Sequence, residues 1–209
     1  MQPPVSFPKV TWVFIAVLFI SNTFLAVATL SAESQSELTA ILRQMEQVWQ
    51  HPLPMGFSQV VDAKGWLGKY HFTSTVVRDE KGTHVSVTGA PVFISSDFLA
   101  DLADFKKAMV GFDLKYNGKI TLDNKEYYLL SGARRKGINS GALEGSIWVD
   151  AKTYLVYRLQ ARYSWGKVDV LHTYAQKSGY TVLLTQEATV SPISMGMTVM
   201  YSDYWFGKR

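Results

Sequence analysis

Cysteine is absent from all 209 residues. This absence excludes disulfide bonds, thiolate metal sites, cysteine nucleophiles and the attachment of lipid to an N-terminal cysteine. A protein without disulfide bonds or thiolate metal sites must be held together by the packing of its core. The chain is long enough to form such a core.

Residue patterns of common enzymes and metal sites are also missing. The histidines show neither HxH nor HExxH spacing, and no GxSxG sequence is present. The stretch Gly137–Gly141 lacks the Lys-Ser/Thr ending of a phosphate-binding loop. We therefore predict a protein that is not an enzyme and that uses no metal and no cofactor. A secreted enzyme is the third of our functional hypotheses.

Net charge is low, at a formal +4. Lys9 is the only charged residue before Glu33, so residues 33–209 carry 20 basic and 17 acidic side chains, a net +3. This balance does not favour nucleic acid, and we expect no nucleic-acid partner. The basic cluster Arg134–Lys136 has two interpretations. It either meets lipid phosphate or an anionic membrane surface in a transient contact, or it is a solvated loop.

The N-terminal region contains the one long apolar run, Val10–Ala28, which follows the single basic Lys9. Small residues near its end suit a cleavage site, which is the pattern of a secretory signal. The alternative is an uncleaved anchor, since the run is about long enough to span a bilayer, although polar residues 21–23 interrupt it. We expect residues 1–32 to direct export to the periplasm, and residues 33–209 to form one domain.

Two segments have apolar residues at helical spacing. The first is Glu33–Gln50, which Pro52 ends, and the second is Ser95–Met109, which Gly111 ends. Polar residues cover the remaining sides, so each apolar stripe is expected to pack on another element. The stripe of the first segment contains Leu38, Ile41, Leu42, Met45, Val48 and Trp49. The stripe of the second contains Phe98, Leu99, Leu102, Phe105 and Met109.

From Phe57 onward the chain is dominated by short segments of alternating polar and apolar residues. The clearest, Gly145–Tyr163, alternates on both sides of a polar turn at Asp150–Thr153. This pattern predicts an antiparallel hairpin with one buried face. A slip of one residue would turn every side chain to the other face, so the alternation defines the pairing. The expected buried face carries Leu155, Tyr157, Leu159, Ala161 and Tyr163.

The segments add up to about nine to eleven strands and two helices. A sheet of that size must curl, close or be covered, because exposed edges promote aggregation. We therefore predict a mainly β (α+β) domain with one strongly curved antiparallel sheet, or half-open β-barrel, whose concave face is covered by the two helices. A flat two-sheet sandwich would leave both apolar helix stripes without a partner.

Short sequence motifs support a family resemblance. Phe57–Gln59 looks like a Phe-x-Gln opening of a first strand, and Glu126–Leu130 followed by Ile147–Asp150 and Tyr154–Arg158 looks like a meander with an aspartate turn. With the order of elements, these residues resemble the LolA/LolB lipoprotein-carrier superfamily. That superfamily includes the periplasmic sensor RseB and outer-membrane lipoprotein-sorting proteins. The resemblance covers most of residues 36–206.

Two departures from the family pattern are clear. The chain has no lipobox cysteine, which disfavours LolB itself. In LolA-type carriers an arginine- and proline-containing segment follows the early strands, and Val76–Arg78 and Ala90–Pro91 do not reproduce it.

The resemblance implies an apolar cavity between sheet and helices that takes acyl chains or apolar peptide. Our leading hypothesis is an exported, monomeric, non-enzymatic carrier of lipid, acyl chains or lipoprotein. The alternative is an RseB-like sensor that binds a protein of the envelope. The candidate lid and cavity residues are Phe98, Leu99, Leu102, Phe105, Met109, Leu155, Tyr157 and Leu159. For the lid residues, simple packing on the sheet is an equal alternative.

Overall fold

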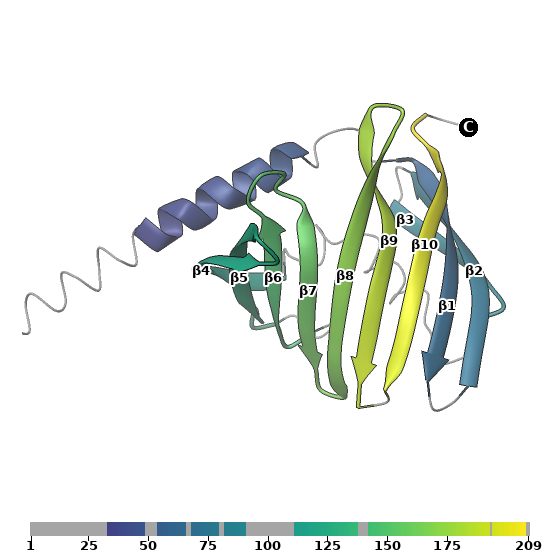
Figure 1. Cartoon of the computed structure of the whole chain (residues 1–209). Coiled ribbons are helices and arrows are strands. Elements are labelled where there is room, and N and C mark those ends of the chain that lie inside the picture. The colour runs from purple at the N-terminus through teal and green to yellow at the C-terminus, as the bar shows by residue number, and fades with distance from the viewer. Residues whose placement is uncertain are drawn as a thin grey trace, which may run out of the picture.

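The structure is a computed structural model, shown in Figure 1. It describes residues 33–48, 54–65, 68–79, 82–90, 111–137, 142–192 and 194–207. The expected export signal at residues 1–32 and the expected second helix at Ser95–Met109 lie outside the described residues.

Ten antiparallel strands form one sheet in the order β3-β2-β1-β10-β9-β8-β7-β6-β5-β4. The strands are β1 (Gly56–Gly65), β2 (Gly68–Asp79), β3 (Gly82–Thr88), β4 (Phe112–Leu122), β5 (Lys125–Arg134), β6 (Glu144–Asp150), β7 (Val156–Tyr163), β8 (Gly166–Lys177), β9 (Tyr180–Ser191) and β10 (Met195–Trp205). The sheet is open, with β3 and β4 at its edges. Figure 1 shows it strongly curled. The prediction of a large curved antiparallel sheet is confirmed.

One pairing departs from simple sequence order. Strand β1 pairs with β10, with Val61 opposite Val199. This pairing joins strands β1–β3 to the end of the seven-strand meander that runs from β4 to β10. As a result, the two edge strands β3 and β4 follow each other in the sequence.

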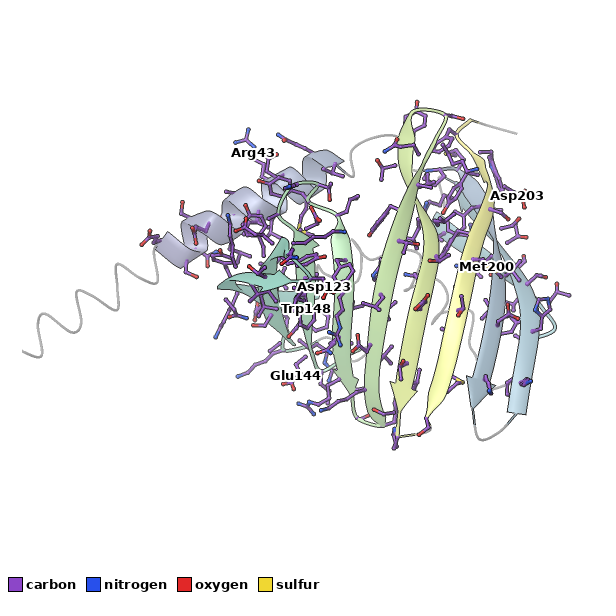
Figure 2. The ribbon with its side chains drawn as sticks, in the orientation of Figure 1. Arg43, Asp123, Glu144, Trp148, Met200 and Asp203 are labelled. Carbon is purple, nitrogen blue, oxygen red and sulfur yellow. The ribbon has the colours of Figure 1, made fainter. Side chains whose placement is uncertain are left out.

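A helix at residues 33–48 lies across the β4–β6 end of the sheet (Figure 1). Leu38, Ile41 and Met45 are its buried residues, at the predicted spacing. The Ser34 hydroxyl donates to the Tyr116 carbonyl at 3.3 Å, which ties the start of the helix to β4. Arg43 is on the exposed side and points away from the sheet (Figure 2). The first predicted helix is confirmed. It is the one helix in the described part of the chain, and it is not long and apolar enough to cross a membrane.

The buried apolar residues form two clusters. The helix cluster joins the helix to β5–β7 and contains Leu38, Ile41, Met45, Leu130, Ile147, Val149 and Val156. The strand cluster contains Phe57, Val61, Ala63, Phe72, Val76, Val168, Val170, Ala188, Val190, Met195, Met197, Val199 and Tyr201. Leu159 packs against both clusters, so they lie on one side of the sheet, here called the core face.

The β6–β7 hairpin has the predicted turn, and it has the predicted alternation only from Leu159 onward. The Asp150 carboxylate accepts hydrogen bonds from the backbone N–H groups of Lys152 and Thr153, at 2.9 and 2.8 Å. A β-bulge then lies in β7, because Trp148 pairs with Arg158 while the next residue of β6 pairs with Val156. The extra residue resets which side chains face the core.

The bulge corrects the predicted face of this hairpin. Val156 is 1 % exposed and belongs to the helix cluster. Tyr157 stacks instead on Tyr127, with ring centroids 4.7 Å apart. Since the neighbouring Tyr128 packs on the helix cluster, Tyr127 and Tyr157 lie on the opposite face. Leu155 precedes β7 in the connection. The predicted buried face is therefore wrong for Tyr157, because a bulge interrupts the period of two, and it is confirmed for Leu159, Ala161 and Tyr163, which are buried or pack against the clusters.

Helix docking gives a direct stability prediction. Leu130 is 0 % exposed in the helix cluster, so Leu130→Ala leaves a cavity beneath the helix and is expected to cost about 2–5 kcal/mol of unfolding free energy. Leu184, 42 % exposed, is the matched control, and Leu184→Ala is expected to change stability by less than about 0.5 kcal/mol. Urea unfolding measures both. Equal effects of the two substitutions would contradict the assigned core face.

Candidate functional site

A row of buried polar side chains crosses the strand cluster. Its members come from five neighbouring strands, in the order β2, β1, β10, β9 and β8. They are Ser74, Gln59, Tyr201, Gln186 and His172. Gln59 pairs in register with Ser74 on one side and with Tyr201 on the other, and Gln186 pairs with His172. We call this set the polar row.

Hydrogen bonds link the members of the polar row. The Ser74 hydroxyl donates to Gln59 Oε1, and the Tyr201 hydroxyl donates to Gln186 Oε1. Two further tyrosines are tied to backbone carbonyls near the row. Tyr174 donates to the Val156 carbonyl at 2.9 Å, and Tyr204 donates to the Leu183 carbonyl at 2.5 Å.

One polar atom of the row stands apart. Gln59 is 0 % exposed, and its Nε2 makes no hydrogen bond of ordinary geometry to the residues that the structure describes. The Tyr201 hydroxyl lies beside this amide: it donates its hydrogen to Gln186, and its oxygen is the acceptor that faces Gln59. A buried donor without an acceptor costs about 1–3 kcal/mol, so such atoms are rare in folded proteins.

Burial keeps the polar row uncharged. It raises the pKa of Tyr201 far above the usual range, against a smaller lowering effect of Gln59. It also lowers the pKa of His172 to about 4, against a smaller raising effect of a hydrogen bond with the Tyr157 backbone. At neutral pH the row therefore offers hydrogen-bonding groups without charge, inside an otherwise apolar surface.

The sequence contains a local signal for the polar row that alternation alone does not explain. Gln59 occupies the core-facing position between Phe57 and Val61, and His172 occupies the one after Val170. Polar residues at core positions of neighbouring strands mark such a row. Recognising it also requires the strand order, because β1 and β10 are far apart in the chain.

The predicted site residues are only partly placed by the structure. Leu159 lies where the two clusters meet, and Leu155 lies in the turn before β7. Tyr157 is on the face away from the core, as described above. The five lid candidates, Phe98, Leu99, Leu102, Phe105 and Met109, lie outside the described residues. Their role as a lid stays a prediction.

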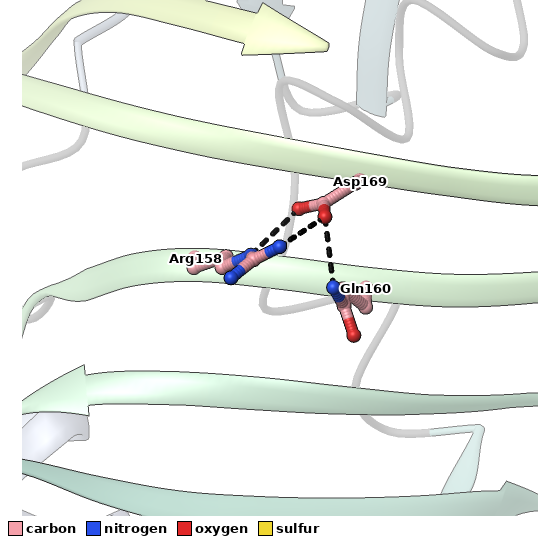
Figure 3. A network of polar contacts seen from close by, with 3 residues as sticks. All are labelled: Arg158, Gln160 and Asp169. Atoms are coloured by element: carbon pink, nitrogen blue, oxygen red, sulfur yellow. Dashed lines mark hydrogen bonds and ion pairs between the residues drawn. The ribbon is translucent and has the colours of Figure 1, made fainter. Parts of the chain in front are cut away.

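The opposite face of the sheet is polar and carries ion pairs. In Figure 3, Arg158 Nε donates to Asp169 Oδ1 at 2.8 Å, and Gln160 Nε2 donates to Asp169 Oδ2 at 2.8 Å. Partial burial pushes the pKa of Asp169 up, but the bonds from Arg158 and Gln160 outweigh it and lower the pKa. The Arg158 guanidinium also lies over the Trp148 ring, 5.2 Å from its centroid. Figure 2 shows where Trp148 lies on β6.

A hollow of about 940 Å³ lies on this polar face, along β4 to β9. Its carboxylates are paired with arginines: Asp113 with Arg135 at 2.9 Å, Glu144 with Arg162 at 2.6 Å, and Asp169 with Arg158. Such a lining is a poor match for hydrocarbon. Within the described ranges, no group of three or more His, Asp or Glu residues is placed to hold a metal ion.

Comparison with known proteins gives matches at the level of structure. No family model and no curated protein matches the sequence. A LolA superfamily protein from Nitrosomonas europaea superposes with a TM-score of 0.60 at 10% identity, over 82% of this chain and 94% of that chain. The chain has a LolA-like fold.

Two further solved structures agree with this assignment. An outer membrane lipoprotein-sorting protein domain from Vibrio parahaemolyticus, named as putative, has a TM-score of 0.59 at 10% identity, over 81% of this chain and 93% of that chain. A DUF1329 family protein from Desulfovibrio piger has a TM-score of 0.58 at 11% identity, over 80% and 92% of the two chains. At these identities the likeness shows the fold, and the resemblance inferred from sequence is confirmed at that level.

The buried histidine of the polar row predicts a pH dependence of stability. Because burial lowers the pKa of His172 to about 4 from 6.5, the unfolded chain binds a proton in this interval that the folded protein does not. The free energy of unfolding is therefore expected to have its full value above pH 6.5. It should fall by about 3 kcal/mol as the pH drops toward 4.

Urea unfolding at pH 7 and pH 4.5 measures this loss. His172→Gln is expected to remove most of it. His71→Gln is the matched control, because the His71 ring is exposed and bonds to Asp62 at 2.7 Å on the surface. An unchanged pH dependence in His172→Gln would show that this histidine does not control acid stability.

Proposed function

We propose that the chain is an exported, non-enzymatic carrier that holds lipid, acyl chains or the acyl part of a lipoprotein against the strand cluster. In this proposal residues 1–32 direct export to the periplasm, residues 33–209 form the binding domain, and the carrier acts as a monomer in the cell envelope. The helix at Ser95–Met109 is the proposed movable cover.

One observation carries the proposal: a LolA-like sheet whose core face has a large apolar half, in which the buried residues that the structure describes come from β1, β2 and β8–β10. The described helix packs on the other half. An acyl chain laid on such a surface gains about 0.8 kcal/mol per buried methylene. A chain of about 16 carbons therefore supplies on the order of 10 kcal/mol before ordering costs, enough for stable transport through water.

A bulky substitution in the strand cluster tests the location of the cargo. Ala188 lies buried in this cluster, and Ala188→Phe is expected to weaken binding of a fluorescent fatty acid at least about tenfold by adding bulk to the core face of β9 where the cargo is proposed to lie. Ala133, exposed and lining the hollow on the polar face, is the control, and Ala133→Phe is expected to leave binding unchanged. Circular dichroism spectra of both variants are expected to match that of the unmodified protein, which checks that they fold.

Organic extraction and native mass spectrometry of the exported protein complete the test, and lipid is expected to copurify. Loss of binding in Ala133→Phe alone would place the ligand on the polar face and contradict the proposal. A lipid-free protein that binds no acyl probe and instead holds one stoichiometric envelope protein would favour the RseB-like alternative.

A further inference from the structure

The turns of the sheet lie at two opposite ends, and charge is divided unevenly between these ends. Antiparallel pairing brings the β1–β2, β5–β6, β7–β8 and β9–β10 turns to one end, and the β2–β3, β4–β5, β6–β7 and β8–β9 turns to the other. Counted with two strand residues on each side, the first four turns carry seven basic residues and one acidic residue, whereas the other four carry five of each. We call the first end the basic end.

The basic residues of this end are Lys64, Lys69, Arg134–Lys136, Arg162 and Lys167. Backbone hydrogen bonds join the cluster Arg134–Lys136 to the end of β7. The Arg134 N–H donates to the Leu143 carbonyl at 2.9 Å, and the Leu143 N–H donates to the Arg162 carbonyl at 2.7 Å. The positive charges of β5 and β7 therefore form one surface.

Some of these charges are neutralised locally and others are not. Arg135 is paired with Asp113 and Arg162 with Glu144. Three lysines of the basic end, Lys64, Lys69 and Lys167, are exposed and form no ion pair with a carboxylate of the described residues. Their charge is open to a partner from solution.

The positive sign of the basic end also holds when the rest of the chain is counted. Residues 66–67, 138–141 and 193, which lie outside the described residues, contain no charged side chain. Residues 91–110 contain three aspartates and two lysines. If these residues and Asp113 are all assigned to the basic end, it still keeps a net charge of +4.

An exposed aromatic pair lies at the same end. Trp165, in the β7–β8 turn, is 52 % exposed, and its ring stacks on Tyr163 with centroids 4.8 Å apart. Tyr163 in turn packs against the strand cluster, so the pair continues the apolar surface of that cluster to the turn. Trp and Tyr are enriched at membrane–water interfaces, where their amphipathic rings lie at the level of the lipid headgroups.

Close packing between neighbouring turns fixes the position of this pair. A Cβ added at Gly166 would lie 1.9 Å from the carbonyl oxygen of Ser191, at the end of β9. A Cβ at Gly65 would lie 3.2 Å from the Cα of Met195, at the start of β10. Glycine permits these approaches. The turns of β1–β2, β7–β8 and β9–β10 thus lie side by side along the lower edge of the sheet in Figure 1.

This combination fits the surface of an anionic bilayer. Lysines near such a surface are attracted by its negative potential, and the attraction adds up over separate turns without precise geometry. The headgroup layer accepts an exposed Trp ring. The link from Trp165 through Tyr163 to the strand cluster favours lipid over other anionic partners, because a lipid that leaves a membrane here meets apolar side chains at once.

We propose that the basic end docks on an anionic phospholipid bilayer, with Trp165 in the headgroup layer and Lys64, Lys69 and Lys167 facing lipid phosphates. Docking brings the end of the strand cluster to the membrane surface, where the cargo of the proposed carrier enters and leaves. The docking surface is an addition to the carrier function, and its binding to a bilayer does not require that the strand cluster hold an acyl chain.

Vesicle flotation of the exported protein tests the proposal with two lipid compositions, phosphatidylcholine alone and phosphatidylcholine with 30 mol% phosphatidylglycerol. Binding to the anionic vesicles is expected to be at least about tenfold tighter, and to fall in 0.5 M NaCl. The apolar run Val10–Ala28 is uncharged, so an uncleaved N-terminus would add equally to binding of both vesicles.

Two triple substitutions with the same change of charge locate the contact. Replacing Lys64, Lys69 and Lys167 with Gln is expected to remove most of the preference for anionic vesicles. The control replaces Lys125, Lys152 and Lys177, three exposed lysines in turns of the opposite end, and is expected to keep the preference. Both triple variants are expected to bind a fluorescent fatty acid as the unmodified protein does.

A fluorescence measurement places Trp165 itself. The emission of Trp165 is the difference between the unmodified protein and Trp165→Tyr, which keeps an aromatic ring in the turn. This difference is expected to be quenched by anionic vesicles whose lipids are brominated near the headgroup. It is expected to be unchanged by neutral vesicles of the same brominated lipid.

The results separate the docking surface from the carrier function. Equal binding to neutral and anionic vesicles, equal effects of the two triple substitutions, or an unquenched Trp165 would each overturn the docking proposal and leave the carrier function standing. Loss of fatty-acid binding in the unmodified protein, with binding to anionic vesicles retained, would overturn the carrier function and leave the docking surface.

Discussion

Strands β1 and β10 come from opposite ends of the described sheet in sequence, yet they pair along nearly their whole length. Every other neighbouring pair is a local hairpin. Closing such a long loop is entropically costly, so the apolar contacts between the strands must offset it. Val61, Ala63, Met197 and Val199 supply these contacts within the strand cluster. Without this pairing the strand cluster would divide into two parts, and two further strand edges would be exposed.

The same pairing builds the polar row. Gln59 is placed beside Tyr201 only by the β1–β10 register, and Ser74 and Gln186 then follow from the local hairpins on either side. A register shift of one residue would turn Gln59 to the polar face and bring Ser58 to the core. Burying these groups in an apolar core lowers stability compared with hydrocarbon side chains, although their mutual hydrogen bonds offset part of that cost.

Local patterns were predictable from sequence and non-local ones were not. The helix at residues 33–48 and the Asp150 turn follow from apolar spacing and from side-chain hydrogen bonding to the backbone, both of which act over a few residues. The bulge in β7 could not be foreseen, because Val156 and Tyr157 are both acceptable on a buried face. Only the pairing with β6 decides between them. The polar row was missed for the same reason, since its members come from five strands whose order is set by the β1–β10 contact.

In the proposed function, the polar face of the sheet contributes to stability and the core face binds the cargo. Ion pairs such as Arg158–Asp169 stabilise the polar face, and the helix covers one half of the core face. In the proposed function, the strand cluster is the surface that holds the cargo. Intermolecular NOEs between a bound acyl-chain ligand and ¹³C-labelled valine methyl groups test this assignment most directly. The account predicts NOEs from the acyl chain to Val61, Val170 and Val199 of the strand cluster. NOEs confined to Val149 and Val156 of the helix cluster would contradict it.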